Sequence, residues 1–194
     1  MSDIEAIRQA LYLFHLPSAV RGARDKPLPV GIMQMLEVAA GDETASQAAS
    51  SRLERPVDLI RQACGFYIEQ IMLAPEADPY RILGAGRGVS DAELRRHMAL
   101  LQRWVHPDAD RSGERSVYAG RVSGAWEALK THERRAAYDA AHPPKAAKPS
   151  SSGPSSSGSK RKHDAQSRRS GGPAPKRSGL LSAAFRYILG RRPT

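Results

Sequence analysis

Three adjacent residues, His106, Pro107 and Asp108, have the clearest chemical character in this sequence. An imidazole and a carboxylate so close together could act as a general acid and base. No suitably placed nucleophile or metal-binding set accompanies them, so we expect no enzyme activity, no bound metal and no cofactor. A structural interpretation also fits, in which a helix ends at the proline and an aspartate turn follows.

Two other segments could carry chemistry, and each has a structural explanation. Cys64, the single cysteine, lies in an apolar helical stripe, so we expect a buried small hydrophobe rather than a nucleophile. Ala85-Gly86-Arg87-Gly88 superficially suggests a phosphate loop, but it follows a short helix rather than a strand and lacks a Gly-Lys-Ser/Thr ending. We expect these glycines to form a turn.

Two amphipathic helices flank the His-Pro-Asp segment. Ser90 and Glu93 form a capping box that begins a helix running to Val105, and Pro107 ends it. A second helix begins near Glu114, after a short polar loop. The pair predicts an antiparallel hairpin with His-Pro-Asp in its loop. The apolar stripes are Leu94, Met98, Leu101 and Val105 in the first helix and Tyr118, Val122, Ala125 and Leu129 in the second.

Shorter elements complete this region. Residues 78–84 (DPYRILG) predict a short helix opened by proline and closed by glycine, and residues 133–139 (ERRAAYD) predict a short polar helix. On the first long helix, three arginines project away from the apolar stripe and form a solvent-facing arginine ridge. They are Arg95, Arg96 and Arg103.

This arrangement resembles the J domain of the DnaJ co-chaperone family. Four blocks match in order: the DPYRILG opening, the AELRR start of the long helix, HPD at 106–108, and the AWEAL…ERRAAYD close. The resemblance implies a J domain over 76–142 that binds a DnaK-type heat-shock chaperone and triggers its ATP hydrolysis. It also implies that His106, Pro107 and Asp108 form the essential loop, while the arginine ridge meets an acidic patch on the ATPase.

The chain departs from the family pattern at several positions. Met98 replaces the usual tyrosine, Ala99-Leu100 replaces a common basic pair, and Ala119 replaces a common phenylalanine; Gln102 and Trp104 are also atypical. The ridge is therefore thinner than usual, so chaperone binding is expected to be weaker or tuned to one chaperone. Without Gly/Phe-rich or zinc-binding regions, the chain resembles a minimal class whose flanking regions select a location or a client, here unknown.

The N-terminal region, residues 1–75, predicts three helices. They span Asp3–Leu16, Val30–Ala40 and a segment that begins at Pro56. The third is apolar on more than one side, as expected of a helix packed between other elements. The sequence leaves open whether this region packs on the J domain, binds a client or mediates dimerisation.

The positive charge lies near the C-terminus. The chain of 194 residues has a net charge of +10, and residues 140–194 hold twelve Lys and Arg and one acidic residue. Residues 143–178, rich in Ser, Gly and Pro, predict a disordered linker, while residues 179–192 predict an amphipathic helix. The helix could anchor the chain to an anionic membrane, a partner or its own body, and the basic linker could bind nucleic acid. The anchor residues would be Leu181, Phe185, Ile188 and Leu189.

The overall prediction is an all-α protein. It consists of a J-domain hairpin with short flanking helices, preceded by a small helical region and followed by a basic tail that ends in an amphipathic helix. The chain has no run of eighteen apolar residues and begins with acidic residues rather than a basic leader, so we expect a cytoplasmic protein. Membrane attachment through the tail would make it peripheral.

Overall fold

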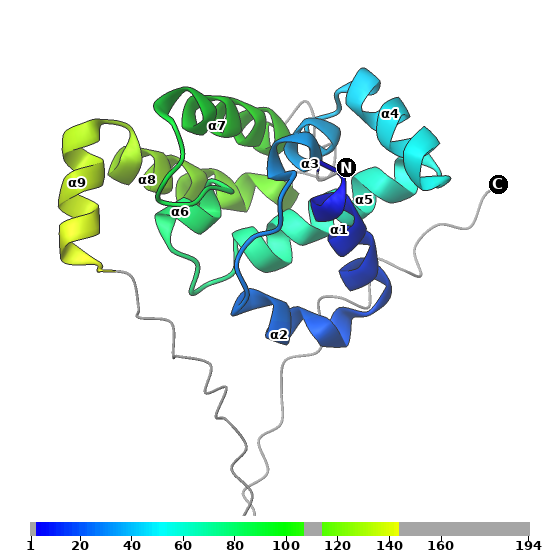
Figure 1. Ribbon diagram of the computed structural model, residues 1–194, viewed down its shortest axis with the longest axis horizontal. Helices are drawn as coiled ribbons and strands as arrows, with labels where there is room; N and C mark the ends of the chain where they lie inside the picture. The colour runs from blue at the N-terminus through cyan, green and yellow to red at the C-terminus, as the bar shows by residue number, and fades with distance from the viewer. Residues whose placement is uncertain (1–2, 107–113, 144–194) are drawn as a thin grey trace, which may run out of the picture. The chain divides into compact units, whose positions relative to one another are not determined.

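The computed structural model describes residues 3–106 and 114–143, and throughout these ranges the regular elements are helices (Figure 1). The predicted all-α class is confirmed. The linker and C-terminal helix predicted for 143–178 and 179–192 lie outside these ranges, apart from residue 143. In chain order the elements are α1 (Glu5–His15), η1 (Pro17–Ala19), α2 (Val20–Arg24), α3 (Ile32–Ala39), α4 (Glu43–Leu53), α5 (Val57–Tyr67), η2 (Ile68–Met72), α6 (Pro79–Ile82), α7 (Asp91–Val105), η3 (Glu114–Tyr118), α8 (Ala119–Leu129) and α9 (His132–Ala141).

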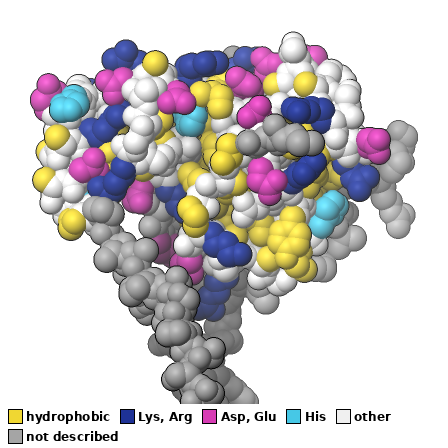
Figure 2. All heavy atoms as spheres, in the orientation of Figure 1, with side chains coloured by type: hydrophobic (Ala, Val, Ile, Leu, Met, Phe, Trp, Pro, Cys, Tyr) yellow, Lys and Arg dark blue, Asp and Glu magenta, His cyan; other side chains and the backbone are white. Residues whose placement is uncertain are grey.

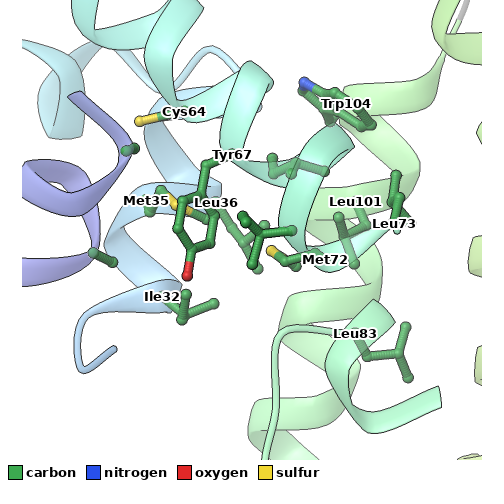
Figure 3. Packing of buried hydrophobic residues seen from close by; sticks show 14 of the residues in the cluster. Ile32, Met35, Leu36, Cys64, Tyr67, Met72, Leu73, Leu83, Leu101 and Trp104 are labelled. Carbon is green, nitrogen blue, oxygen red and sulfur yellow. The ribbon is translucent and has the colours of Figure 1, made fainter. Parts of the chain in front are cut away.

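Helix α5 and its π-helical continuation η2 form the centre of a compact unit that spans Met1–Ala147. Figure 3 shows the close packing of their side chains with those of α3, α6 and α7. Ile60, Cys64, Tyr67 and Ile71 are each at most 1% exposed. The prediction that this helix packs between other elements is therefore confirmed. Burial also raises the pKa of the Cys64 thiol to about 12, so it stays protonated and inert, as expected.

A single hydrophobic cluster joins the N-terminal helices to the helical hairpin. Gly84, just after α6, has a φ of 68°, a conformation that glycine adopts without strain. A Cβ at this position would lie 2.7 Å from Cγ2 of Ile32 and 2.9 Å from Cε of Met72. The missing side chain therefore lets the end of α6 approach both α3 and η2.

Two arginines add polar links between the same regions. The Arg81 guanidinium on α6 donates to the carbonyls of Ala23, Lys26 and Ile71, at 3.2, 2.9 and 3.1 Å. Arg121 on α8 donates to the carbonyls of residues 73 and 74, at 3.1 and 2.7 Å. These carbonyls lie at helix ends, where the backbone lacks intrahelical partners, so the arginines satisfy groups that would otherwise need water.

The three helices predicted before Pro75 correspond to α1, α3 and α5, but the structure adds α2 and α4. Helix α4 buries few residues, among them Ser46 and Ala49, so its apolar pattern is faint. Its start is nevertheless well defined, because the Asp42 carboxylate accepts the Ala45 amide at 2.8 Å as an N-cap. Helix α2 has only five residues and includes a glycine, which weakens its local signal.

Candidate functional site

Helix α7 begins and packs as the sequence predicts. The Ser90 hydroxyl accepts the Glu93 amide at 3.2 Å, and the Glu93 carboxylate accepts the Ser90 amide at 3.3 Å, which completes the capping box. The predicted core residues of α7 are all buried, as are three of the four in the second helix. Tyr118 alone is half-buried. The apolar stripes predicted for the two helices of the hairpin are thus confirmed.

His106 ends helix α7, immediately before the proline. Its φ of −67° and ψ of 136° are extended, which is the conformation favoured before proline. Its amide donates to the Arg103 carbonyl at 3.4 Å, and its side chain is exposed. Pro107 and Asp108 lie outside the described residues, as do the anchor residues predicted in the tail, Leu181, Phe185, Ile188 and Leu189.

The arginine ridge is exposed on α7, as predicted, but it adjoins the N-terminal region. Nη2 of Arg96 lies 3.8 Å from Oε1 of Glu37 on α3. The Arg96 side chain is 68% exposed, so the pair contributes little to stability and remains available for exchange with a partner. In the view of Figure 2, Lys and Arg side chains lie dispersed among Asp and Glu, consistent with a nearly neutral body.

The opening and closing blocks of the J-like segment meet in space. The Tyr80 hydroxyl donates to Oδ2 of Asp139 at 3.0 Å, and Arg87 pairs with Oδ1 of the same carboxylate at 2.5 Å. The Tyr80 and Tyr138 rings pack edge to face at 5.9 Å. Burial, reinforced by the Asp139 hydrogen bond, raises the Tyr80 pKa to about 12. Arg87, in the glycine-rich turn, therefore holds α9 in place.

Trp104 is an element of the site that sequence reasoning missed. Its indole is 1% exposed, stacks on Tyr118 with ring centroids 6.2 Å apart, and lies 5.1 Å from the Arg115 guanidinium. The sequence did hold a signal, because Trp104 lies seven residues after His97 and both flank the predicted apolar stripe. Both side chains are buried, so the apolar face of α7 is wider than predicted.

His97 connects α7 to the end of α6. Its Nδ1 lies 2.9 Å from the Leu83 carbonyl, and the ring is 7% exposed. Burial lowers the His97 pKa below its usual 6.5, against the opposing effects of the Leu83 carbonyl and the Glu93 carboxylate. The ring is therefore neutral at pH 7, with Nδ1–H as the donor to Leu83.

We expect the stability of this protein to fall as the pH drops below about 6.5. The unfolded chain then binds a proton at His97 that the folded chain resists, so protonation favours unfolding. The measurement is the midpoint of thermal unfolding between pH 7.5 and 5.5, a window above the carboxylate titrations. His97→Gln, which keeps an N–H donor without titrating, should lose less stability across this window. Equal pH dependence in both proteins would contradict the assignment.

The described residues hold no group of three or more His, Cys, Asp or Glu side chains arranged to bind a metal. In the same part of the chain, no helix is both long and apolar enough to span a bilayer.

Comparison with known proteins gives matches of limited extent. No family model and no solved structure matches the chain. A 66-residue stretch is 39% identical to DnaJ homolog subfamily C member 16 of Gallus gallus. A 67-residue stretch is 36% identical to the Chaperone protein DnaJ of Latilactobacillus sakei. These matches cover 34% of this chain but only 8% and 18% of the two relatives.

The length of these matches agrees with the segment in which the four blocks occur. In the structure that segment forms the packed helices α6 to α9, with Tyr80 and Asp139 joining its two ends. Over about a third of its length, therefore, this chain is homologous to DnaJ-family proteins, which is consistent with a J-domain protein.

Proposed function

We propose that this protein is a co-chaperone that accelerates ATP hydrolysis by a DnaK-type heat-shock chaperone and so assists the folding or remodelling of a specific client. The observation that carries the proposal is the similarity to DnaJ proteins over 66 to 72 residues. It is supported by a helix that exposes three arginines and ends at His106.

In the proposed site, the arginine ridge binds the chaperone and the His-Pro-Asp loop activates its ATP hydrolysis. Arg95, Arg96 and Arg103 attract an acidic surface of the chaperone and orient the encounter. Asp108 offers a carboxylate for a charge-assisted hydrogen bond to an arginine of the ATPase, while Pro107 fixes the direction in which the loop leaves α7. His106 holds the loop shape and contacts the partner. The chemistry of ATP hydrolysis remains that of the chaperone.

Single-turnover hydrolysis of ATP by the DnaK-type chaperone of the same organism tests this function directly. The chaperone is loaded with radiolabelled ATP, and product formation is followed with and without the full-length protein. We expect acceleration that saturates as the concentration of the protein rises. A hydrolysis rate that stays at the basal value at every concentration would overturn the proposal.

A second function, tethering the chaperone to a membrane or nucleic acid, is favoured by the charge of residues 140–194. The tail would then bring the J-domain segment to an anionic surface, with Leu181, Phe185, Ile188 and Leu189 as the membrane anchor. Here the J-domain segment serves only to recruit the chaperone.

We expect Phe185→Glu to abolish binding of the full-length protein to vesicles that contain anionic lipid, because it places a charge in the apolar stripe. Ser182→Glu changes the charge equally outside the stripe and should weaken binding much less. Vesicle sedimentation at low and high salt provides the measurement. Equal loss in both variants would indicate binding by charge alone, and binding of DNA or RNA that falls steeply with salt would favour nucleic acid.

A further inference from the structure

The indole of Trp104 connects both sides of the hairpin loop. Trp104 lies in the last turn of α7, two residues before His106, while Arg115 and Tyr118 lie in η3 directly after the loop. Tyr118 stacks on the indole at an interplanar angle of 28°, and the Arg115 guanidinium lies 5.1 Å from the ring centroid. The two chain segments that enter and leave residues 107–113 are thus joined through one aromatic ring.

The N-terminal region approaches this ring at its Nε1 edge. A Cβ built on Gly65 of α5 would lie 3.8 Å from Nε1 of Trp104 and 3.8 Å from Nη2 of Arg115. An alanine would fit there, but a larger side chain would displace the indole or the guanidinium. Figure 3 shows Trp104 lying between α7 and the central helix. The N-terminal region therefore reaches the base of the loop through α5.

The indole N–H takes no part in holding the Trp104 ring in place. Nε1 of Trp104 is buried and has no hydrogen-bond partner among the described residues. A buried tryptophan usually satisfies this donor, and leaving it unpaired costs stability. The contribution of Trp104 therefore comes from its broad flat ring, which contacts Tyr118, Arg115 and α5 at once.

We propose that Trp104 is a positioning residue for chaperone activation, through which the N-terminal region sets the direction of the His-Pro-Asp loop. This inference rests on the proposed function and deepens it. Fixing both ends of a loop reduces the conformational entropy that must be lost when it engages a partner. The 1–75 region then belongs to the activating unit, although its residues are far from His106 in the sequence.

The expected effect falls on the activation step more than on binding. Arg95, Arg96 and Arg103 are exposed on α7 whereas the indole is buried, so the concentration that gives half-maximal acceleration should change little in a Trp104 variant. The maximal acceleration should fall, because a displaced loop presents Asp108 in the wrong place, and misplacement by about 1 Å can cost a hundredfold.

Four variants of the full-length protein test this inference. Trp104→Leu keeps an apolar side chain but removes the flat ring, whereas Trp104→Phe keeps a smaller flat ring and removes the pyrrole edge that carries the unpaired donor and faces Gly65. Gly65→Val crowds the indole from α5. Gly124→Val is the matched control, because it makes the same change in a helix where a Cβ would meet nothing within 4 Å.

Two measurements are made at a temperature where every variant is folded by circular dichroism. The first is the maximal acceleration of single-turnover ATP hydrolysis, together with the half-saturating concentration. The second is hydrogen–deuterium exchange of the amides of residues 106–116, which needs no chaperone. We expect Trp104→Leu and Gly65→Val to lose at least about fivefold in maximal acceleration and to exchange faster in this segment, while Gly124→Val resembles the wild type and Trp104→Phe, which keeps the ring contacts but not the edge facing α5, falls between them.

The outcomes separate this inference from the proposed function. If the wild type accelerates hydrolysis and Trp104→Leu matches it in both maximal acceleration and amide exchange, the positioning role is overturned and the proposed function stands. Loss of activity without faster exchange would also overturn it, because the indole would then contact the chaperone itself. If the wild type gave no acceleration, the function would fail, and unchanged exchange in Trp104→Leu would still reject loop positioning.

Discussion

Asp108→Asn is expected to reduce the acceleration of ATP hydrolysis by at least about thirtyfold, the loss that follows when one partner of a buried charge-assisted pair is removed at an interface. Asparagine has nearly the same shape as aspartate but carries no charge, so it removes the proposed bond to the chaperone arginine without enlarging or shrinking the loop. The thermal unfolding midpoint should stay close to that of the wild type.

His106→Gln should give a comparable loss for a related reason. His106 is exposed at the end of α7 and does not belong to the buried hydrophobic cluster. Glutamine can still donate and accept hydrogen bonds but lacks the imidazole ring that we assign to the loop shape and the partner contact. The measurement for both variants is single-turnover hydrolysis over a range of protein concentrations.

Asp110→Asn provides the matched control, because it neutralises another carboxylate of the same loop only two residues away. We expect it to retain most of the acceleration. Equal activity of Asp108→Asn and the wild type would contradict the role of the carboxylate. Equal loss in Asp108→Asn and Asp110→Asn would point instead to the net charge of the loop.

The hairpin could be predicted from the sequence because local signals agreed there. Ser90 and Glu93 mark the start of α7, Pro107 marks its end, and the apolar residues recur at helical spacing between them. Each signal acts within a few residues, so a single sequence reveals it. The same holds for α6, where Asp78 caps the helix through the Arg81 amide at 2.9 Å.

The contacts between the N-terminal region and the hairpin could not be predicted in this way. Arg81 binds carbonyls 55 and 58 residues earlier in the chain, and Glu37 approaches Arg96 from a separate helix. Such pairings depend on how the helices pack, and nothing in the local pattern of either partner specifies the other. The burial of Trp104 has the same origin, because α5 covers a position that the isolated hairpin would expose at its edge.

Because the hairpin packs against the N-terminal region, residues 76–147 alone are expected to have a much smaller free energy of unfolding than residues 1–147. Removal of the N-terminal region would expose the α5-facing side of Trp104, and we expect it to uncover parts of Leu83 and Leu101, which belong to the same buried cluster as the apolar residues of α3, α5 and η2. Uncovering a large apolar side chain fully costs roughly 1.5–3 kcal/mol, so partial exposure of three should cost about 3–6 kcal/mol. A small domain with roughly 5–15 kcal/mol of stability would lose much of it.

The loss of hydrogen bonds from two arginines should also lower the stability of the shorter chain. Without residues 1–75, Arg81 loses the carbonyls of Ala23, Lys26 and Ile71, and Arg121 loses those of residues 73 and 74. Water can replace these partners at the surface, so the loss is smaller than that of the apolar packing. The shorter chain should still be helical by circular dichroism but should unfold at lower urea and bind a hydrophobic dye.

Urea unfolding of the two chains, with limited proteolysis of the full-length protein, would measure this dependence. Residues 1–147 should unfold in one cooperative transition and survive proteolysis as one fragment, because a single apolar cluster runs through both regions. Two separate transitions, or a 76–147 chain as stable as 1–147, would mean that the hairpin is an independent domain and that the N-terminal helices merely adjoin it. A single transition would mean that mutations in α3 or α5 reach the chaperone-binding surface through the shared core, although no residue of these helices belongs to the His-Pro-Asp loop.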